Sequence, residues 1–184
     1  MWRAPAILLT TALLATGCGG DDEPSGSKGT SEASRACPEG TQLVRAKDLI
    51  GEPPKGYRIA KGDQPLLKTI ADQFGAGLGT SARGHDARVL VKRDAVNGAA
   101  VIVVNASERT GDSENLIAGA KAAEKNTGVD GELLEIAGKD GYIVQAVDGG
   151  YIAMAPAGAC SIVVLVADTE KLVRAAAGYL KPAA

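Results

Sequence analysis

The residues with the greatest capacity for chemistry are Ser81, His85 and Asp86, which fall within six consecutive positions and include the only histidine of the chain. A serine, a histidine and a carboxylate can act as nucleophile, base and orienting group, but only when the three side chains converge in one geometry. So short a spacing rarely permits that convergence, and the surrounding stretch is polar. We therefore expect His85 to lie in an exposed loop and predict no catalytic residue.

Candidate ligands for a metal or a cofactor are equally scarce. One histidine and three cysteines provide few soft ligands, and the acidic run at residues 21–23 lacks EF-hand spacing. Gly75, Gly77 and Gly79 superficially resemble a phosphate-binding loop, but they follow a predicted helix, whereas phosphate is bound at the start of one. We expect no metal and no cofactor.

The three cysteines stand at positions 18, 37 and 160, and the first follows an unusual N-terminal stretch. Arg3 precedes an apolar run over residues 4–15, and small residues then lead to Cys18. This order is typical of a secretory signal peptide. The run is too short for a membrane span, which needs about 20 apolar residues.

Residues 13–18, which read Leu-Leu-Ala-Thr-Gly-Cys, resemble the lipobox of bacterial lipoprotein precursors. The resemblance implies that Cys18 becomes the lipidated, palmitate-bearing first residue of the mature protein. The chain would then be anchored by lipid in the cell membrane and exposed on its extracytoplasmic side. The family usually places Leu where this chain has Ala15, so ordinary cleavage at a small-x-small site and an uncleaved anchor are the alternatives.

An odd number of cysteines leaves one thiol unexplained in an exported protein. Lipidation of Cys18 would consume one thiol and leave Cys37 and Cys160 to form a disulfide in an oxidising compartment. Two buried free thiols are the alternative.

Composition excludes a nucleic-acid-binding class. Removing residues 1–17 leaves 19 Lys and Arg against 22 Asp and Glu, a charge of about −3 with no basic stripe. That part of the chain also holds one Phe, four Tyr and no Trp, too few aromatic side chains for base stacking.

Three regions follow from these patterns: a signal peptide at 1–17, a flexible tether at 18–36 and one globular domain at 37–184. The tether is rich in Gly, Ser, Asp and Glu without apolar periodicity. Its root-mean-square reach is about 20–25 Å by flexible-chain scaling.

Hydrophobic periodicity predicts the elements of the domain. Helices are expected at 65–74, 113–127 and after Asp168, which we predict to be a helix cap. Strands are expected at residues 42–46, 57–61, 88–94, 99–105, 132–137, 142–147, 151–155 and 160–167. Asn97-Gly98 is a strong hairpin signal, and the glycosylation-like sequence that begins at Asn105 is expected to mark a strand end. The last strand, apolar on both faces, should be central.

The expected fold is therefore α+β: a single domain with a mostly antiparallel sheet and two or three helices packed on it. Short turns between strands disfavour a parallel sheet, which needs longer crossovers. Arg88, Lys92 and Arg93 suggest an edge or one-sided strand whose charges block further pairing. A surface for anionic lipid or cell-wall polymer is the alternative.

Because the constellations needed by an enzyme are absent from the sequence, we predict a non-catalytic binding or accessory module. Its expected partners are the membrane, through the lipid anchor, and an unknown envelope protein or a small apolar ligand, without nucleic acid. The alternative is a carrier of apolar cargo, such as lipid, within the cell envelope. An enzyme that uses carboxylates or hydroxyls not recognisable by spacing is a third interpretation.

Overall fold

The computed structural model describes residues 36–53, 55–62, 64–77, 82–92, 98–110, 113–127, 129–146 and 149–182. The predictions for the signal peptide, for Cys18, for the tether up to residue 35, and for Ser81 and Arg93 lie outside these residues. No helix in the described ranges is both long enough and apolar enough to span a bilayer.

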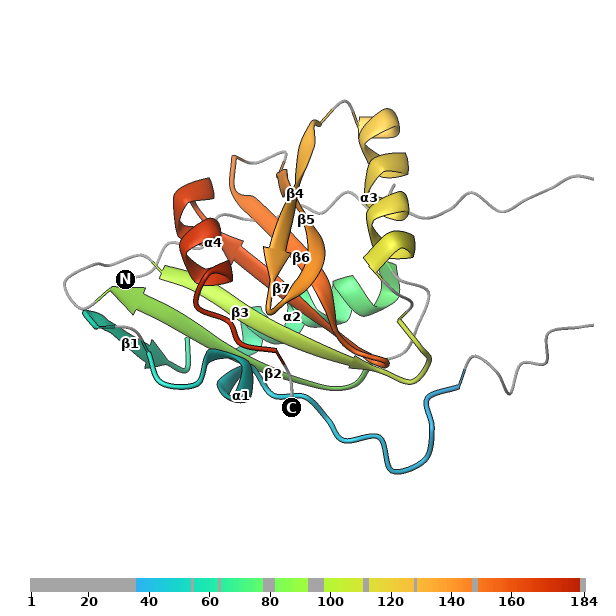
Figure 1. The fold of residues 1–184 in the computed structure, drawn as a ribbon, viewed down its shortest axis with the longest axis horizontal. Coiled ribbons are helices and arrows are strands. Elements are labelled where there is room, and N and C mark those ends of the chain that lie inside the picture. Colours follow the sequence, from blue (N-terminus) through green and yellow to red (C-terminus); the bar gives the residue numbers. More distant parts are fainter. Residues whose placement is uncertain are drawn as a thin grey trace, which may run out of the picture.

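The domain is α+β and has one seven-stranded sheet (Figure 1). The chain order is α1 (Ala46–Ile50), β1 (Tyr57–Ala60), α2 (Gln64–Gly77), β2 (Ala82–Lys92), β3 (Gly98–Ala106), α3 (Ser113–Thr127), β4 (Gly131–Ile136), β5 (Lys139–Gln145), β6 (Tyr151–Gly158), β7 (Ser161–Ala167) and α4 (Glu170–Ala177).

The strands lie in the order β1-β2-β3-β7-β6-β5-β4, and every neighbouring pair is antiparallel. The sequence predicted that the last strand is central, and β7 is the middle strand of the seven, with every residue buried. Its run of Ile, Val and Leu has apolar side chains on both faces, which suits a strand buried on both sides.

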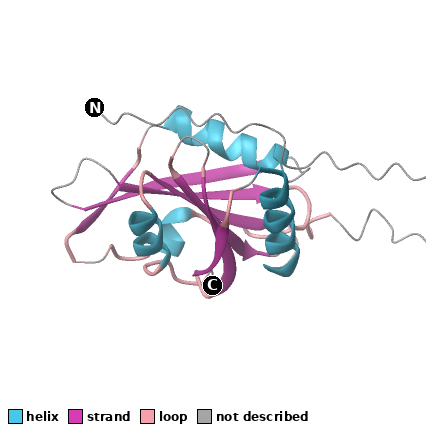
Figure 2. Ribbon diagram, turned by 90° about the horizontal axis from the view of Figure 1, so that it is seen from above, coloured by secondary structure: helices cyan, strands magenta, loops and turns pink. Residues whose placement is uncertain are grey.

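Two hydrophobic clusters lie on opposite faces of the sheet, since alternate side chains of a strand point to opposite faces. Val163 and Leu165 of β7 join the first cluster with residues of α1 and α4. Ile162 and Val164 join the second cluster with residues of α2 and α3. Figure 2 shows helices on both sides of the sheet. We call these the α1/α4 face and the α2/α3 face.

Helix α2 illustrates how sequence produces one of these contacts. Pro65 lies in its first turn, where a missing N–H costs nothing. Leu67, Ile70, Ala71 and Phe74 recur at helical spacing and are all buried in the second cluster.

Three local predictions are wrong. Residues 42–45 form no strand, and Ala46 begins the short helix α1. The side chain that caps α4 is Thr169, whose Oγ1 accepts from the Leu172 backbone N–H at 3.4 Å, and not Asp168. Strand β2 begins at Ala82, so the polar stretch expected to be a loop is part of the sheet from that residue onward.

Candidate functional site

His85 does not lie in an exposed loop: it is half-buried within β2 and pairs with Val104 of β3. Asp86 is the next residue of the same strand, so its side chain points to the opposite face of the sheet. Ala87 and Val89, on the His85 side, belong to the α2/α3 face, and Leu90, on the Asp86 side, belongs to the α1/α4 face. The two side chains therefore cannot act together on one substrate. This excludes a catalytic triad that uses both His85 and Asp86.

Cys37 and Cys160, the predicted pair, come together in the structure. Their sulfur atoms lie 2.14 Å apart, at disulfide distance, across 123 positions of sequence. The backbone N–H of Cys37 also donates to the oxygen of Ser107 at 3.1 Å, and that of Ala106 donates to the oxygen of Cys160 at 2.8 Å. The start of the domain is thereby joined to the end of β3 and to the turn between β6 and β7.

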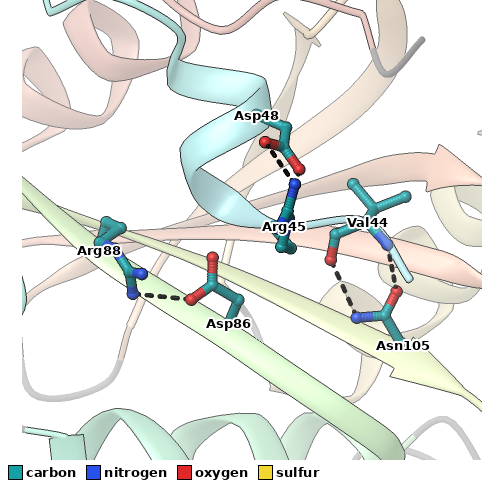
Figure 3. A network of polar contacts seen from close by, with 6 residues as sticks. All are labelled: Val44, Arg45, Asp48, Asp86, Arg88 and Asn105. Atoms are coloured by element: carbon teal, nitrogen blue, oxygen red, sulfur yellow. Dashed lines mark hydrogen bonds and ion pairs between the residues drawn. The ribbon is translucent and has the colours of Figure 1, made fainter. Parts of the chain in front are cut away.

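Asn105 is a polar side chain that is only 3 % exposed. Its Oδ1 accepts from the backbone N–H of Val44 at 2.9 Å and from the hydroxyl of Ser161 at 2.8 Å. Its Nδ2 donates to the oxygen of Val44 at 3.1 Å (Figure 3). Asn105 lies at the predicted strand end, and its burial is incompatible with glycosylation. Its role is structural, because it holds the segment before α1 against β3.

A charged group lies beside Asn105, on the α1/α4 face of β2 (Figure 3). Arg88 donates from Nη1 to Asp86 Oδ1 at 2.7 Å, and both side chains are at least three-quarters buried. At the start of α1, Arg45 donates to Asp48 at 2.7 Å. The hydrogen bond raises the pKa of Arg45 and lowers the pKa of Asp48, and the nearby Asp86 carboxylate also raises that of Arg45.

Asp86 also has a buried oxygen, Oδ2, without a hydrogen-bond partner among the described residues. Buried carboxylate oxygens normally have a hydrogen-bond partner, so Asp86 Oδ2 is an exception among the described residues. Arg88 Nη1 additionally donates to the backbone oxygen of Ala87 at 2.7 Å.

Strand β2 extends well beyond its outer neighbour. Strand β1 pairs only with residues 89–92 of β2, while β3 pairs with β2 from Ala82 to Val91, with a register shift between Ala82 and Gly84. The outer side of residues 82–88 therefore pairs with no strand of the described chain. We call this stretch the open β2 edge. Of the two alternatives for the basic residues, an edge strand or a one-sided strand, the edge strand is wrong for Lys92, which pairs with Tyr57 of β1.

The open β2 edge and β1 form a basic margin of the sheet. The described residues 55–62 and 82–92 contain six Lys and Arg and one acidic residue, Asp86, which is paired with Arg88. Five of the six basic side chains are exposed: Lys55, Arg58, Lys61, Arg83 and Lys92. This margin attracts anionic groups, although the domain as a whole is slightly acidic.

The opposite margin of the sheet is acidic. Residues 130–136, which include the outermost strand β4, contain Asp130, Glu132 and Glu135 without any Lys or Arg. Glu132 is contacted by Arg174 of α4, which also binds Glu170. Leu133 is 62 % exposed on this strand. The sheet therefore ends in two margins of opposite charge.

Sequence reasoning identified Arg88 and Lys92 but missed the contribution of β1 and the open β2 edge. The alternation of Arg83, His85 and Ala87 with Gly84 and Asp86 carries no apolar periodicity, so no strand signal was present there.

Within the described ranges, no three His, Cys, Asp or Glu side chains are grouped so that they could hold a metal ion. Comparison of the chain with protein-family models, curated proteins and solved structures gave no match.

Proposed function

We propose that this chain is a lipid-anchored, non-catalytic binding module of the cell envelope, whose binding surface is the basic margin formed by β1 and the open β2 edge. Export and lipidation at Cys18 rest on the lipobox resemblance of residues 13–18. A tether of the composition found before Cys37 would let the domain reach partners near the membrane.

The observation that carries the binding role is the open β2 edge. No described strand pairs with the outer side of residues 82–88, so the backbone groups on that side, apart from the Ala87 oxygen bound by Arg88, offer a template on which an extended segment can add as a further strand. In that mode, backbone hydrogen bonds provide affinity and side chains provide selectivity. The basic side chains of this margin select a partner segment rich in Asp and Glu, because opposite charges across the interface favour association.

The charges beside the open β2 edge also disfavour non-specific strand pairing. Charged side chains on an exposed strand discourage contact with apolar strands, and Arg83 and Arg58 present cations beside the open β2 edge. A partner must therefore bring compensating negative charge, which makes the margin selective.

Site-specific photo-crosslinking in the organism that carries the gene tests this proposal. A photoreactive residue at Arg83 should cross-link to an acidic, extended segment, and added salt should reduce the yield severalfold by screening. The same residue at Lys171, exposed on α4, is the matched control. Equal cross-linking from both positions, or no cross-linked protein at Arg83, would contradict the proposal.

Intact-mass analysis of the natively expressed chain tests the anchor separately. We expect the loss of residues 1–17 and added acyl groups on Cys18. A species that retains Met1 or lacks acyl groups would refute the anchor. Extraction of the same sample with organic solvent distinguishes the module from an apolar-cargo carrier, because stoichiometric non-covalent lipid would favour the carrier.

A further inference from the structure

We infer that the acidic strand received by the open β2 edge is β4 of a second copy of this chain, so that the domain assembles head to tail by extending its sheet. The inference rests on the proposed function, since it names the partner of the same edge. The inference is based on one observation: the two edges of the sheet carry opposite charges.

Strand direction favours this arrangement. Because every neighbouring pair is antiparallel, β1, β3, β6 and β4 run one way and β2, β7 and β5 run the other. A second copy in the same orientation would therefore place its β4 antiparallel to β2. In the first copy, β1 lies beside residues 89–92 of β2. The β4 of the second copy would lie in line with β1, beside residues 82–88 of the same β2. The six residues of β4 are one fewer than the seven of the open β2 edge, so β4 could cover most of that edge.

Side-chain faces match in the same orientation. Glu132 contacts Arg174 of α4, so it lies on the α1/α4 face of its sheet. Arg88 lies on the α1/α4 face of β2, so Glu132 of one copy would stand on the same face as Arg88 of the next. On the other face, Glu135 and the exposed Leu133 would stand beside His85 and Ala87. Glu132 and Arg88 carry opposite charges, which stabilise a cross-strand pair, and Leu133 would lose solvent exposure.

Charge also disfavours the symmetrical alternatives. Two β4 strands paired with each other would bring the Glu132 and Glu135 side chains of both copies to one interface without any Lys or Arg of β4 to neutralise them. Two open β2 edges would likewise bring the arginines of both copies together. Like charges opposite one another destabilise strand pairs. The favoured contact therefore joins unlike surfaces, which generates a ring or an open filament rather than a closed dimer.

Charge reversal followed by mixing tests the inference on the full lipidated chain, purified in detergent. Assembly mass is measured by light scattering and sedimentation at about 50 mM and about 500 mM salt, because screening weakens exposed charge pairs. One variant carries Glu132→Lys and Glu135→Lys. The other carries Arg58→Glu and Arg83→Glu, which are exposed and leave the Asp86–Arg88 pair intact.

The wild type should form multimers at low salt that weaken at high salt. Each variant alone should associate at least about tenfold more weakly, because like charges then meet at the interface or directly beside it. An equal mixture should recover the wild-type mass, since one variant has two basic margins and the other two acidic ones. A misfolded variant could not be rescued in this way.

Glu114→Lys on α3 and Lys171→Glu on α4 are the matched controls and should assemble as the wild type does. A wild type that is a single chain at both salt concentrations, reversal variants that assemble normally, or a mixture that stays dissociated would each overturn the inference. If that happens while Arg83 still cross-links to an acidic segment of another protein, the proposed function stands and only the second copy is excluded.

Discussion

Asn105 is the side chain that joins three separate segments of the chain: the residues before α1, strand β3 and strand β7. Replacement by Ala would leave the N–H and C=O of the partly buried Val44 and the hydroxyl of the buried Ser161 without these partners. Unsatisfied buried polar groups cost about 1–3 kcal/mol each. We expect Asn105→Ala to lower the free energy of unfolding by about 3 kcal/mol, because the surrounding structure would relax and recover part of the summed loss.

Urea denaturation followed by circular dichroism, with the disulfide intact, measures this loss. Ser161→Ala is the matched control, because it removes a single hydrogen bond and leaves Asn105 bound to both polar groups of Val44. Its cost should be about 1 kcal/mol. Equal losses for the two variants would show that Asn105 does not hold the segment before α1.

Tyr142 is a buried phenol whose hydroxyl donates to Glu124 of α3 at 2.6 Å. Burial and this hydrogen bond raise the pKa of Tyr142 to about 12, against about 10 for a free tyrosine. Since the folded state holds the phenolic proton more tightly than the unfolded state, this contribution to stability is complete below pH 10. It is lost as the pH rises from about 10 to about 12.

Ultraviolet titration of tyrosinate in the folded protein should therefore show a late-titrating group that disappears in Tyr142→Phe. The alkaline decline in unfolding free energy should also become shallower in that variant. Simultaneous titration of all tyrosines near pH 10 would contradict the burial of this hydroxyl.

At the scale of elements, alanine substitution at two glycines should have opposite effects on stability. A Cβ at Gly141 of β5 would stand 2.4 Å from the backbone oxygen of Met154 and 2.8 Å from Cβ of Ala155. Because backbone cannot yield as a flexible side chain does, Gly141→Ala should destabilise the sheet by about 1–3 kcal/mol.

Gly119→Ala is the control for that substitution. Gly119 lies within α3 and nothing stands within 4 Å of its Cβ position. Alanine there should stabilise the protein by about 0.5–1 kcal/mol through helix propensity and a less flexible unfolded chain. Thermal unfolding of the two variants should move in opposite directions, and a shared sign would show that the close approach of β5 to β6 is relieved by backbone movement.

The elements that the sequence predicted well are those with a strong apolar pattern. Strand β7 is a continuous apolar run, helix α2 and the helix beginning at Ser113 have apolar residues at helical spacing, and all three appear at the expected positions. The start of β2 was missed because it consists of small and charged residues, and only its pairing with β3 makes it a strand. Thr169 replaced Asp168 as the cap because both residue types favour that position and the sequence could not separate neighbouring candidates.

The candidate site was harder to predict than the fold, since its charges are brought together by pairing rather than by spacing. Arg58 and Val91 are more than 30 residues apart in sequence, and they lie side by side only because β2 pairs antiparallel with β1. The segregation of acidic residues to β4 at the other margin depends on the whole strand order. Neither follows from local composition, which shows a nearly neutral domain.

At the scale of the whole molecule, the Cys37–Cys160 bond closes a very long loop. The chain-entropy model gives an upper value of about 5 kcal/mol for a loop of this size. We expect Cys37→Ala with Cys160→Ala to lose up to that amount of unfolding free energy, measured by denaturation. Cys18 is left unchanged, and wild-type protein treated with reductant should match the double variant. An unfolding midpoint insensitive to reductant would show that the two cysteines do not stabilise the domain.

The same bond also decides how the domain responds to a mechanical load. A pull on the chain from the N-terminal side of Cys37 passes through a covalent link to Cys160, directly before the central strand β7. The load therefore reaches the middle of the sheet without first peeling away the segment before α1, whose own attachment is a few hydrogen bonds. A force applied at the N-terminal side of Cys37 would therefore not unfold the domain progressively from its N-terminal end.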